Sequence, residues 1–329
     1  MRINKKRDVY LDFYRGLASV SVIFIHTAFH SGQTYVPYWA QNLTLLLDVP
    51  FFFFLSGWAG TIRKDTVEKQ EVLDIKGQRA IKKALKGIVQ IWKKWLFFLI
   101  VIQIGCVFFN ISGFTSIFDF LNALFFINVS IGTFSSVGSS IWFLPVYVVV
   151  TFWMGFWMDW MDSGSANTSI NKRPMLISGM AICFMGIVYS TLGGTFFYMS
   201  SYFWFYSFFY ILWYILAQYR VKNIREGLVS VCAFVLLWIG IAQIVQIPAI
   251  DLQKAKFPPI AMYWAASMIS VVIALILKGR LPRFLVGSFI QKIGRNAIWF
   301  YYAQGIGSSL LFFTLEIRLA LHFGDGNCY

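Results

Sequence analysis

The chain has 329 residues, of which 58% are hydrophobic and only 13% are charged. Soluble domains usually carry about twice that charged fraction, so the composition excludes an ordinary soluble protein. The net charge of +14 would suit nucleic-acid binding, but lysine and arginine also collect in the cytoplasmic loops of membrane proteins. We therefore predict an all-α, polytopic membrane protein that binds membrane lipids and no nucleic acid.

Apolar stretches of about 17–25 residues mark helices that can cross a bilayer. We place nine of them, at 16–35, 43–60, 88–109, 140–160, 175–192, 199–219, 227–247, 259–277 and 296–315. A further apolar stretch, 117–129, is too short to span comfortably and is expected to be re-entrant or interfacial. The sequence thus predicts about nine to ten membrane-spanning helices in one domain, residues 1–329, without a separate soluble domain.

The basic residues predict the orientation of these helices. They gather at the N-terminus, between 63 and 86, at 172–173, at 220–226 and between 278 and 295. The connections 110–139 and 193–198, which alternate with these, contain none. Because basic loops stay on the cytoplasmic side, we expect a multi-pass protein with a cytoplasmic N-terminus.

The stretch LDFYRGLASVSVIFIHTAFH, residues 11–30, is apolar yet contains ionisable groups. Arg15 and His26 are eleven residues apart, which on a helix is three turns plus about 20° and about 16 Å along the axis. Asp12, Ser19 and His30 fall on the same stripe. Polar groups on one stripe of a membrane helix face a protein interior or a wet cavity rather than lipid.

His26 is expected near the middle of a hydrocarbon core about 30 Å thick. Desolvation disfavours the charged imidazole, and a neutral imidazole can accept a proton as a general base does near pH 7. A structural histidine that is hydrogen-bonded between helices is the other interpretation. The register with Arg15 favours catalysis.

The first helix, LDFYRGLASVSVIFIH, resembles that of the acyltransferase-3 family of integral membrane acyltransferases, in which an arginine and a histidine are separated by ten residues. VPFFFFLSGWAG at 49–60, IWFLPVY at 141–147 and IGRNAIWFYYAQ at 293–304 are similar to later motifs of that family. The chain departs from the pattern in two places. Lys83 and Lys86 stand where relatives have two arginines three residues apart, and Gln304 stands where relatives often have a histidine.

The resemblance implies a bacterial glycan O-acetyltransferase of the cytoplasmic membrane. Such an enzyme takes an acyl group, usually acetyl, from cytoplasmic acetyl-CoA or another acyl-CoA, and needs no metal. It passes the group to a hydroxyl of a polysaccharide, such as a cell-wall glycan, or of a lipid-linked sugar. By this resemblance His26 deprotonates the acceptor hydroxyl and Arg15 helps to hold the donor.

A basic helix face is the predicted binding site for the nucleotide end of the donor. Its members are spaced by three and four residues: Arg79, Lys82, Lys83 and Lys86. An anchor for anionic lipids is the alternative interpretation of the same residues. Less specific expectations concern the substrate. Asp48 is expected to orient His26 or a sugar hydroxyl, or else to be a helix-entry residue, and His30 is a candidate acceptor contact. Oxyanion donors are expected among Ser56, Trp142 and Asn296.

A glycan or lipid-linked sugar transporter, or a flippase, is the alternative function. In such a protein the polar stripe on the first helix would line a substrate path, and no acyl transfer would occur.

Overall fold

The computed structural model describes residues 8–30, 36–67, 79–129, 131–164, 173–194, 200–216, 221, 223–278, 280–282 and 288–323. These residues form helices and connecting turns, and their one β contact is an isolated bridge between Lys256 and Pro259. The prediction of an all-α protein is confirmed.

Each of the nine apolar stretches coincides with a helix. In chain order these are α1 (Val9–His30), α3 (Val49–Val67), α4 (Arg79–Phe108), α7 (Phe143–Gly164), α8 (Arg173–Thr191), α9 (Ser200–Leu216), α10 (Ile224–Val245), α12 (Ala261–Leu277) and α15 (Ala297–Phe323). Among the described residues, five helical stretches are long and apolar enough to cross a membrane: Tyr38–Ala59, Ala80–Phe108, Ser136–Met161, Arg173–Thr191 and Ile224–Val245. The apolar α12 is shorter, at 17 residues.

Short helices join the long ones. They are α2 (Tyr38–Thr44), the 3₁₀ helix η1 (Leu45–Leu47), α5 (Ile117–Leu124), α6 (Ser135–Ser140), α11 (Leu252–Lys256) and α14 (Phe289–Arg295). The stretch at 117–129 contains only the 8-residue α5, as its length predicts. The indole nitrogens of Trp92 and Trp95 donate to the carbonyls of Leu124 and Ala123, at 3.3 and 3.0 Å, and so hold the end of α5 against α4.

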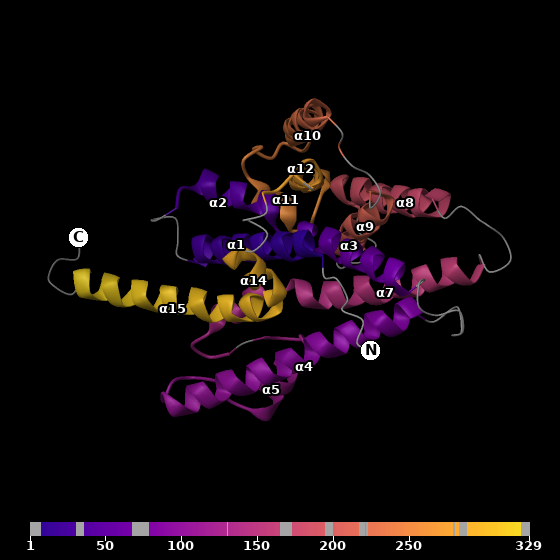
Figure 1. Ribbon diagram of the computed structural model, residues 1–329. Coiled ribbons are helices and arrows are strands. Elements are labelled where there is room, and N and C mark those ends of the chain that lie inside the picture. The colour runs from indigo at the N-terminus through magenta and orange to yellow at the C-terminus, as the bar shows by residue number, and fades with distance from the viewer. Residues whose placement is uncertain are drawn as a thin grey trace.

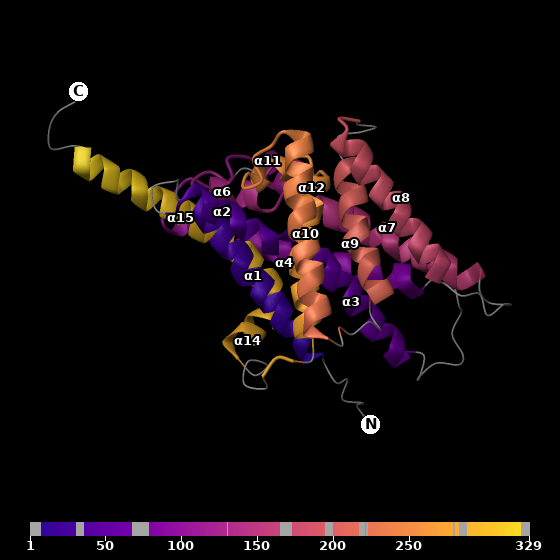
Figure 2. The ribbon, with the colours of Figure 1, turned by 90° about the horizontal axis from the view of Figure 1, so that it is seen from above.

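The long helices form a bundle in which α1 and α15 lie lengthwise against each other (Figure 1). Seen from above, α2, α6 and α11 gather at one end of the bundle, whereas α14 and the start of α1 lie at the other (Figure 2). Arg15 lies near the start of α1 and His26 near its finish, so the two ends of the bundle are called here the Arg15 end and the His26 end.

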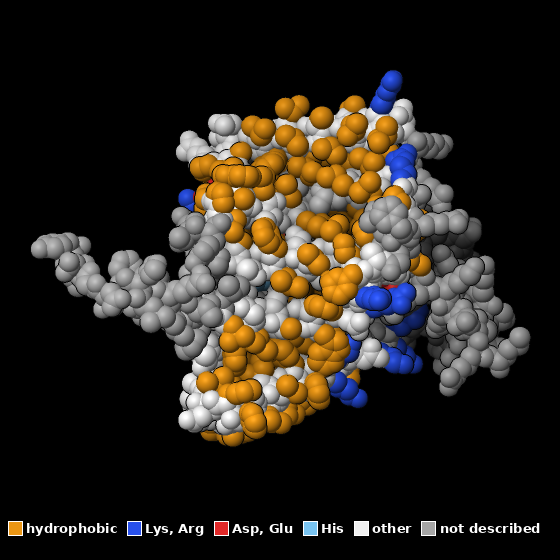
Figure 3. Space-filling view, turned by 60° about the vertical axis from the view of Figure 1, so that its left-hand side comes forward, with side chains coloured by type: hydrophobic (Ala, Val, Ile, Leu, Met, Phe, Trp, Pro, Cys, Tyr) orange, Lys and Arg blue, Asp and Glu red, His pale blue; other side chains and the backbone are white. Residues whose placement is uncertain are grey.

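The outer surface of the bundle suits lipid. Leu236 and Ile244 of α10 are 70% and 80% exposed, which would be costly in water. Figure 3 shows hydrophobic side chains spread over one face and most of the visible lysine and arginine side chains along one of its edges. The fold is therefore that of a membrane-embedded helical protein.

The phenylalanine run at 51–54 builds the centre of the bundle. Phe51, Phe53 and Phe54 are buried, and the ring of Phe53 stacks on Tyr206 of α9 with a centroid separation of 4.5 Å. Aromatic rings lock α3 between α1 and α9, because each buried ring removes a large apolar surface. This packing fixes α3 next to the polar stripe of α1.

Candidate active site

The polar stripe of α1 faces the inside of the bundle. Asp12 and Ser19 are buried, whereas Val20 and Phe24 are 40% and 50% exposed. On a helix Asp12, Ser19 and His26 lie within about 60° of Arg15, whereas Val20 and Phe24 lie about 140–180° away. The lipid-facing side of α1 is therefore opposite to the stripe.

His26 lies on this inner side and is half-buried. The helix runs unbroken from Val9 to His30, so the predicted separation of about 16 Å between Arg15 and His26 applies to the structure. The Ser19 hydroxyl, which lies between them, donates to the Arg15 carbonyl at 2.8 Å. The side chain of His30 lies outside the described residues.

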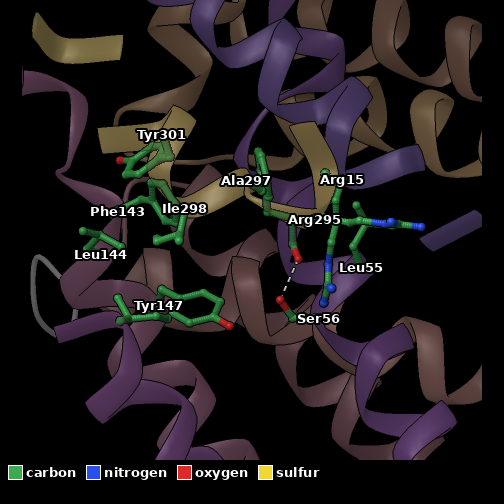
Figure 4. Close-up of a pocket in the computed structure, with 13 residues that line it drawn as sticks. Arg15, Leu55, Ser56, Phe143, Leu144, Tyr147, Arg295, Ala297, Ile298 and Tyr301 are labelled. Atoms are coloured by element: carbon green, nitrogen blue, oxygen red, sulfur yellow. Dashed lines mark hydrogen bonds between the residues drawn. The ribbon is translucent and has the colours of Figure 1, made fainter. Parts of the chain in front are cut away.

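A cavity of about 230 Å³ opens beside Arg15. Thirteen residues line it, from α1, α3, α4, α7, α14 and α15: Arg15, Phe52, Leu55, Ser56, Ile91, Phe143, Leu144, Tyr147, Gly294, Arg295, Ala297, Ile298 and Tyr301. Figure 4 shows Arg15, Arg295 and Ser56 together on one side, and aromatic and aliphatic side chains on the other. His26 is not among these lining residues.

The cavity is electropositive. Two of its lining side chains are guanidinium groups, from Arg15 and Arg295, and none of the described residues that line it is acidic. Asp12, one turn before Arg15, does not line the cavity, and its Oδ2 lies 3.6 Å from Nε of Arg295. Since Arg295 is 48% exposed and Asp12 is buried, the guanidinium is held by Asp12 yet still reaches the cavity.

A close contact between two glycines places Arg295. A Cβ atom on Gly294 would lie 1.7 Å from the Asp12 carbonyl oxygen, and one on Gly16 would lie 1.8 Å from the Ile290 carbonyl oxygen. Neither position has room for a side chain, so α14 presses directly on the backbone of α1. Arg295, the residue after Gly294, is thereby brought beside Asp12.

The basic face of α4 is present as a helix surface. Lys82, Lys83 and Lys86 are exposed on the first two turns of α4, and Ile91 of the same helix lines the cavity. The side chain of Arg79 lies outside the described residues. Farther along α4, Nζ of Lys94 lies 5.7 Å from the centre of the Trp299 ring, which belongs to α15.

A carboxylate of α7 caps the start of α4. The backbone N–H groups of Ala80 and Ile81 donate to Oδ1 and Oδ2 of Asp159, at 2.7 and 2.8 Å. These amides have no partner within their own helix, and a negative charge at a helix N-terminus is favourable. The buried Asp159 therefore positions the basic face of α4.

A second polar cluster lies at the His26 end. Asp48, the residue before α3, is 2% exposed, and its Oδ2 lies 2.6 Å from Nζ of Lys256, which is 5% exposed. The Tyr263 hydroxyl donates to the same oxygen at 2.8 Å. Nζ of Lys256 also lies 5.3 Å from the centre of the Trp142 ring. Lys256 thus connects two of the expected substrate residues, Asp48 and Trp142.

The short helix α11 presents Lys256 to this cluster. Asp251 accepts the backbone N–H of Lys254 at 3.3 Å and forms an ion pair of 2.9 Å with its ammonium group. The hydrogen bond to Asp251 raises the pKa of the exposed Lys254 side chain above its ordinary value. Lys254 faces solvent, whereas Lys256 is buried.

Two of the expected oxyanion donors differ in their placement. Ser56 lines the cavity and its hydroxyl donates to the Phe52 carbonyl at 2.8 Å. Asn296 is exposed between α14 and α15, where its amide nitrogen lies 3.2 Å from the Lys292 carbonyl. The cavity-lining residues on either side of Asn296 are Arg295 and Ala297.

The fold and this site define a membrane-embedded protein with an electropositive cavity below a buried polar stripe. Comparison with known families agrees with that class: the acyltransferase-domain model of the acyltransferase-3 family matches residues 8–320. The chain belongs to the acyltransferase-3 family. No curated protein and no solved structure matches it.

Two site residues escape prediction from the sequence. Arg295 reaches the cavity only because Gly294 meets the backbone of α1, a contact between segments distant in the chain. Lys256 lies in a connection where a lysine is expected to be solvated. For Arg295 the sequence contains one local indication. The pair Gly294–Arg295 directly precedes an apolar helix, which places a cation at the start of that helix.

Proposed function

We propose that the protein transfers an acyl group, in the simplest case acetyl, from acyl-CoA to a hydroxyl of a cell-surface glycan or a lipid-linked sugar. The observation that carries the proposal is the geometry of α1. One unbroken helix presents Arg15 at an electropositive cavity and, three turns deeper on the same inner side, His26. Membership of the acyltransferase-3 family supports the reaction class.

The donor enters from the Arg15 end, which is the cytoplasmic side of a bacterial cytoplasmic membrane. The gathering of basic side chains along one edge supports this orientation (Figure 3). Arg15 and Arg295 bind phosphate oxygens, because a guanidinium matches the geometry of a phosphate. The exposed lysines Lys82, Lys83 and Lys86, with Arg79, attract the nucleotide end by charge.

The apolar wall of the cavity receives the pantetheine arm. Phe52, Phe143 and Ile298 supply apolar surface next to the two arginines, as a largely uncharged chain requires. An extended arm of about 15–20 Å, the length of a few extended residues, spans the distance along α1 from Arg15 to His26. The thioester would then lie at the depth of the imidazole.

The transfer requires one base and no metal. Neutral His26 takes the proton of the acceptor hydroxyl as its oxygen attacks the thioester carbonyl carbon. The carbonyl oxygen becomes an oxyanion, and when it collapses the C–S bond breaks with its electron pair on sulfur. The imidazolium returns the proton to the thiolate, so that an ester and CoA–SH leave and the enzyme is unchanged.

The acceptor approaches from the His26 end. Trp142 is half-buried there, and aromatic faces stack on sugar rings. Asp48 is engaged by Lys256 and Tyr263, so we assign it to holding this end of the bundle rather than to orienting His26. His30, one turn beyond His26, contacts the acceptor in this scheme.

The test is transfer by purified protein in liposomes, with radiolabelled acetyl-CoA inside and candidate glycans outside. We expect label to leave CoA and to appear on the glycan as an alkali-labile ester. If label stays on CoA while glycan still crosses the bilayer, the protein is a transporter and the proposal is wrong. Mass analysis of the surface glycan with and without the protein then names the modified hydroxyl.

A further inference from the structure

Two of the described side chains of α15 have unsatisfied polar atoms inside the bundle. Gln304 is 5% exposed and Ser308 is 1% exposed. Neither the amide oxygen and nitrogen of Gln304 nor the hydroxyl of Ser308 has a hydrogen-bond partner among the described residues. Burying such groups without partners costs free energy, so natural proteins rarely leave them so. Two unsatisfied donors one turn apart on one helix, the Gln304 amide nitrogen and the Ser308 hydroxyl, indicate a bound group that accepts hydrogen bonds from them.

The other sides of α15 have known neighbours. The Tyr301 hydroxyl donates to the Ser140 carbonyl, and the Ser309 hydroxyl accepts the Ser136 N–H at 3.1 Å, so this side faces α6. The next side faces α4, where the Tyr302 hydroxyl donates to the Ile91 carbonyl at 3.1 Å. The side opposite to α6 is exposed, at Ala303, Gly307 and Leu310.

The orphan atoms occupy the remaining side, which faces α1. At about 100° per residue, Ala297, Gln304 and Ser308 lie within about 40° of one another and away from the α4 and exposed sides. The helix α1 packs along α15, so this side meets α1. Ala297 lines the cavity together with Arg15 of α1, which is consistent with this orientation.

The orphan atoms continue the cavity toward His26. Both helices run from the Arg15 end to the His26 end (Figures 1 and 2). Ser308 follows the cavity residue Ala297 by eleven positions, and His26 follows the cavity residue Arg15 by eleven, so both advance about 16 Å. Gln304 lies about 6 Å short of that depth. The polar atoms are therefore placed where an arm extending from the cavity would carry its thioester.

We infer that Gln304 is a catalytic residue that donates its amide Nε2–H to the thioester carbonyl oxygen, with the Ser308 hydroxyl as a second donor. This inference rests on the proposed acyl transfer. The carbonyl oxygen gains negative charge as the acceptor attacks, and a neutral donor in a water-poor site stabilises that charge without taking up a proton. When the intermediate collapses, the oxygen electron pair re-forms the C=O bond and the C–S electron pair leaves on sulfur, so Gln304 is unchanged over the cycle.

The kinetic test compares Gln304→Met with wild type. Methionine keeps a similar length and volume but donates no hydrogen bond. We expect kcat to fall about 100-fold, as for loss of one oxyanion donor, while the KM for acetyl-CoA rises no more than about fivefold, as for loss of one hydrogen bond. The melting temperature should stay the same or rise, because an unsatisfied amide is replaced by an apolar group. A wild-type kcat in folded Gln304→Met protein would overturn the assignment.

The role of Ser308 can be tested against a matched control, Ser207. Ser207 of α9 is also fully buried with an orphan hydroxyl, but it lies on another helix. We expect Ser308→Ala to lower kcat about tenfold, as for loss of a second, weaker donor. Ser207→Ala should keep the wild-type kcat. Equal losses in the two variants would assign Ser308 to packing.

A binding measurement separates this inference from the proposed function. S-ethyl-CoA lacks the carbonyl oxygen of acetyl-CoA but is otherwise similar. We expect wild-type protein to bind acetyl-CoA about fivefold more tightly than S-ethyl-CoA, the value of one hydrogen bond, and Gln304→Met to bind them equally. If wild-type protein binds no CoA species, the proposed function and this inference both fail. If acetyl-CoA is bound and used while Gln304→Met behaves like wild type, only the role of Gln304 fails.

Discussion

Arg295 Nε lies 3.6 Å from Asp12 Oδ2, in a contact that joins the last part of the chain to its first helix. The contact sits where Gly294 presses on the Asp12 carbonyl, and it sets a second guanidinium beside Arg15 at one cavity. An anion in this cavity would meet two planar cations on adjacent elements.

Arg295→Gln is therefore expected to weaken donor binding. Loss of a charged hydrogen-bond donor should raise the KM for acyl-CoA at least tenfold and leave kcat at saturation nearly unchanged. Steady-state kinetics with varied acyl-CoA provides the measurement. Arg225→Gln is the control, because Arg225 is exposed at the start of α10 and its loss removes the same charge. An unchanged KM in Arg295→Gln would remove this side chain from the donor site.

The basic face of α4 is tested by changing Lys82, Lys83 and Lys86 together to glutamine. If these lysines attract the nucleotide, the KM for acyl-CoA rises while kcat at saturation does not. The effect should fade as salt is added, because exposed charges are screened. A wild-type KM combined with weaker retention in vesicles of anionic lipid would assign the face to lipid anchoring instead.

Asp159→Ala should destabilise the protein and loosen the start of α4. The change leaves the Ala80 and Ile81 amides without acceptors, and losses of helix caps cost about 0.5–2 kcal/mol. Thermal unfolding in detergent measures the loss. The control is Asp119→Ala, which removes the cap of the exposed α5, where the capping box with Ser116 is solvated. A larger loss in Asp119→Ala than in Asp159→Ala would contradict the role given to the buried carboxylate.

The contribution of the Asp48–Lys256 ion pair to stability can be measured by a double-mutant cycle. Breaking a buried ion pair from one side leaves an unpaired buried charge, so Asp48→Asn and Lys256→Met should each cost about 3–5 kcal/mol of unfolding free energy. The double variant should lose much less than the sum of the two, because no lone charge remains. Additive losses would show that the 2.6 Å contact contributes little to stability.

Much of the architecture follows from local sequence. The nine apolar stretches coincide with helices, and the short stretch at 117–129 contains only α5. Boundaries fit less closely. The first helix begins at Val9 rather than 16, and the stretch at 43–60 is broken at Asp48, where the backbone is extended before α3. Pro50, in the first turn of α3, accounts for the break, since it has no N–H and its ring would clash with the carbonyl four residues earlier if the helix continued.

Only part of the candidate site could be predicted from the sequence. Periodicity placed Arg15 and His26 on one inner face of α1, because both belong to the same helix. It could not find Arg295 or Lys256, or the burial of Gln304 without partners, because these depend on contacts across the bundle. The sequence marks Gln304 only as a departure from the family pattern, and its burial without partners, which it shares with Ser308, is visible only in the structure.

The most direct test of the account is acyl transfer and CoA binding by His26→Ala, with Thr27→Ala as a neighbour on the same turn. We predict that His26→Ala loses at least 100-fold in kcat and binds acetyl-CoA with nearly the wild-type Kd, while Thr27→Ala remains active. Wild-type turnover by His26→Ala would show that the imidazole is not the base, and the mechanism proposed here would be wrong.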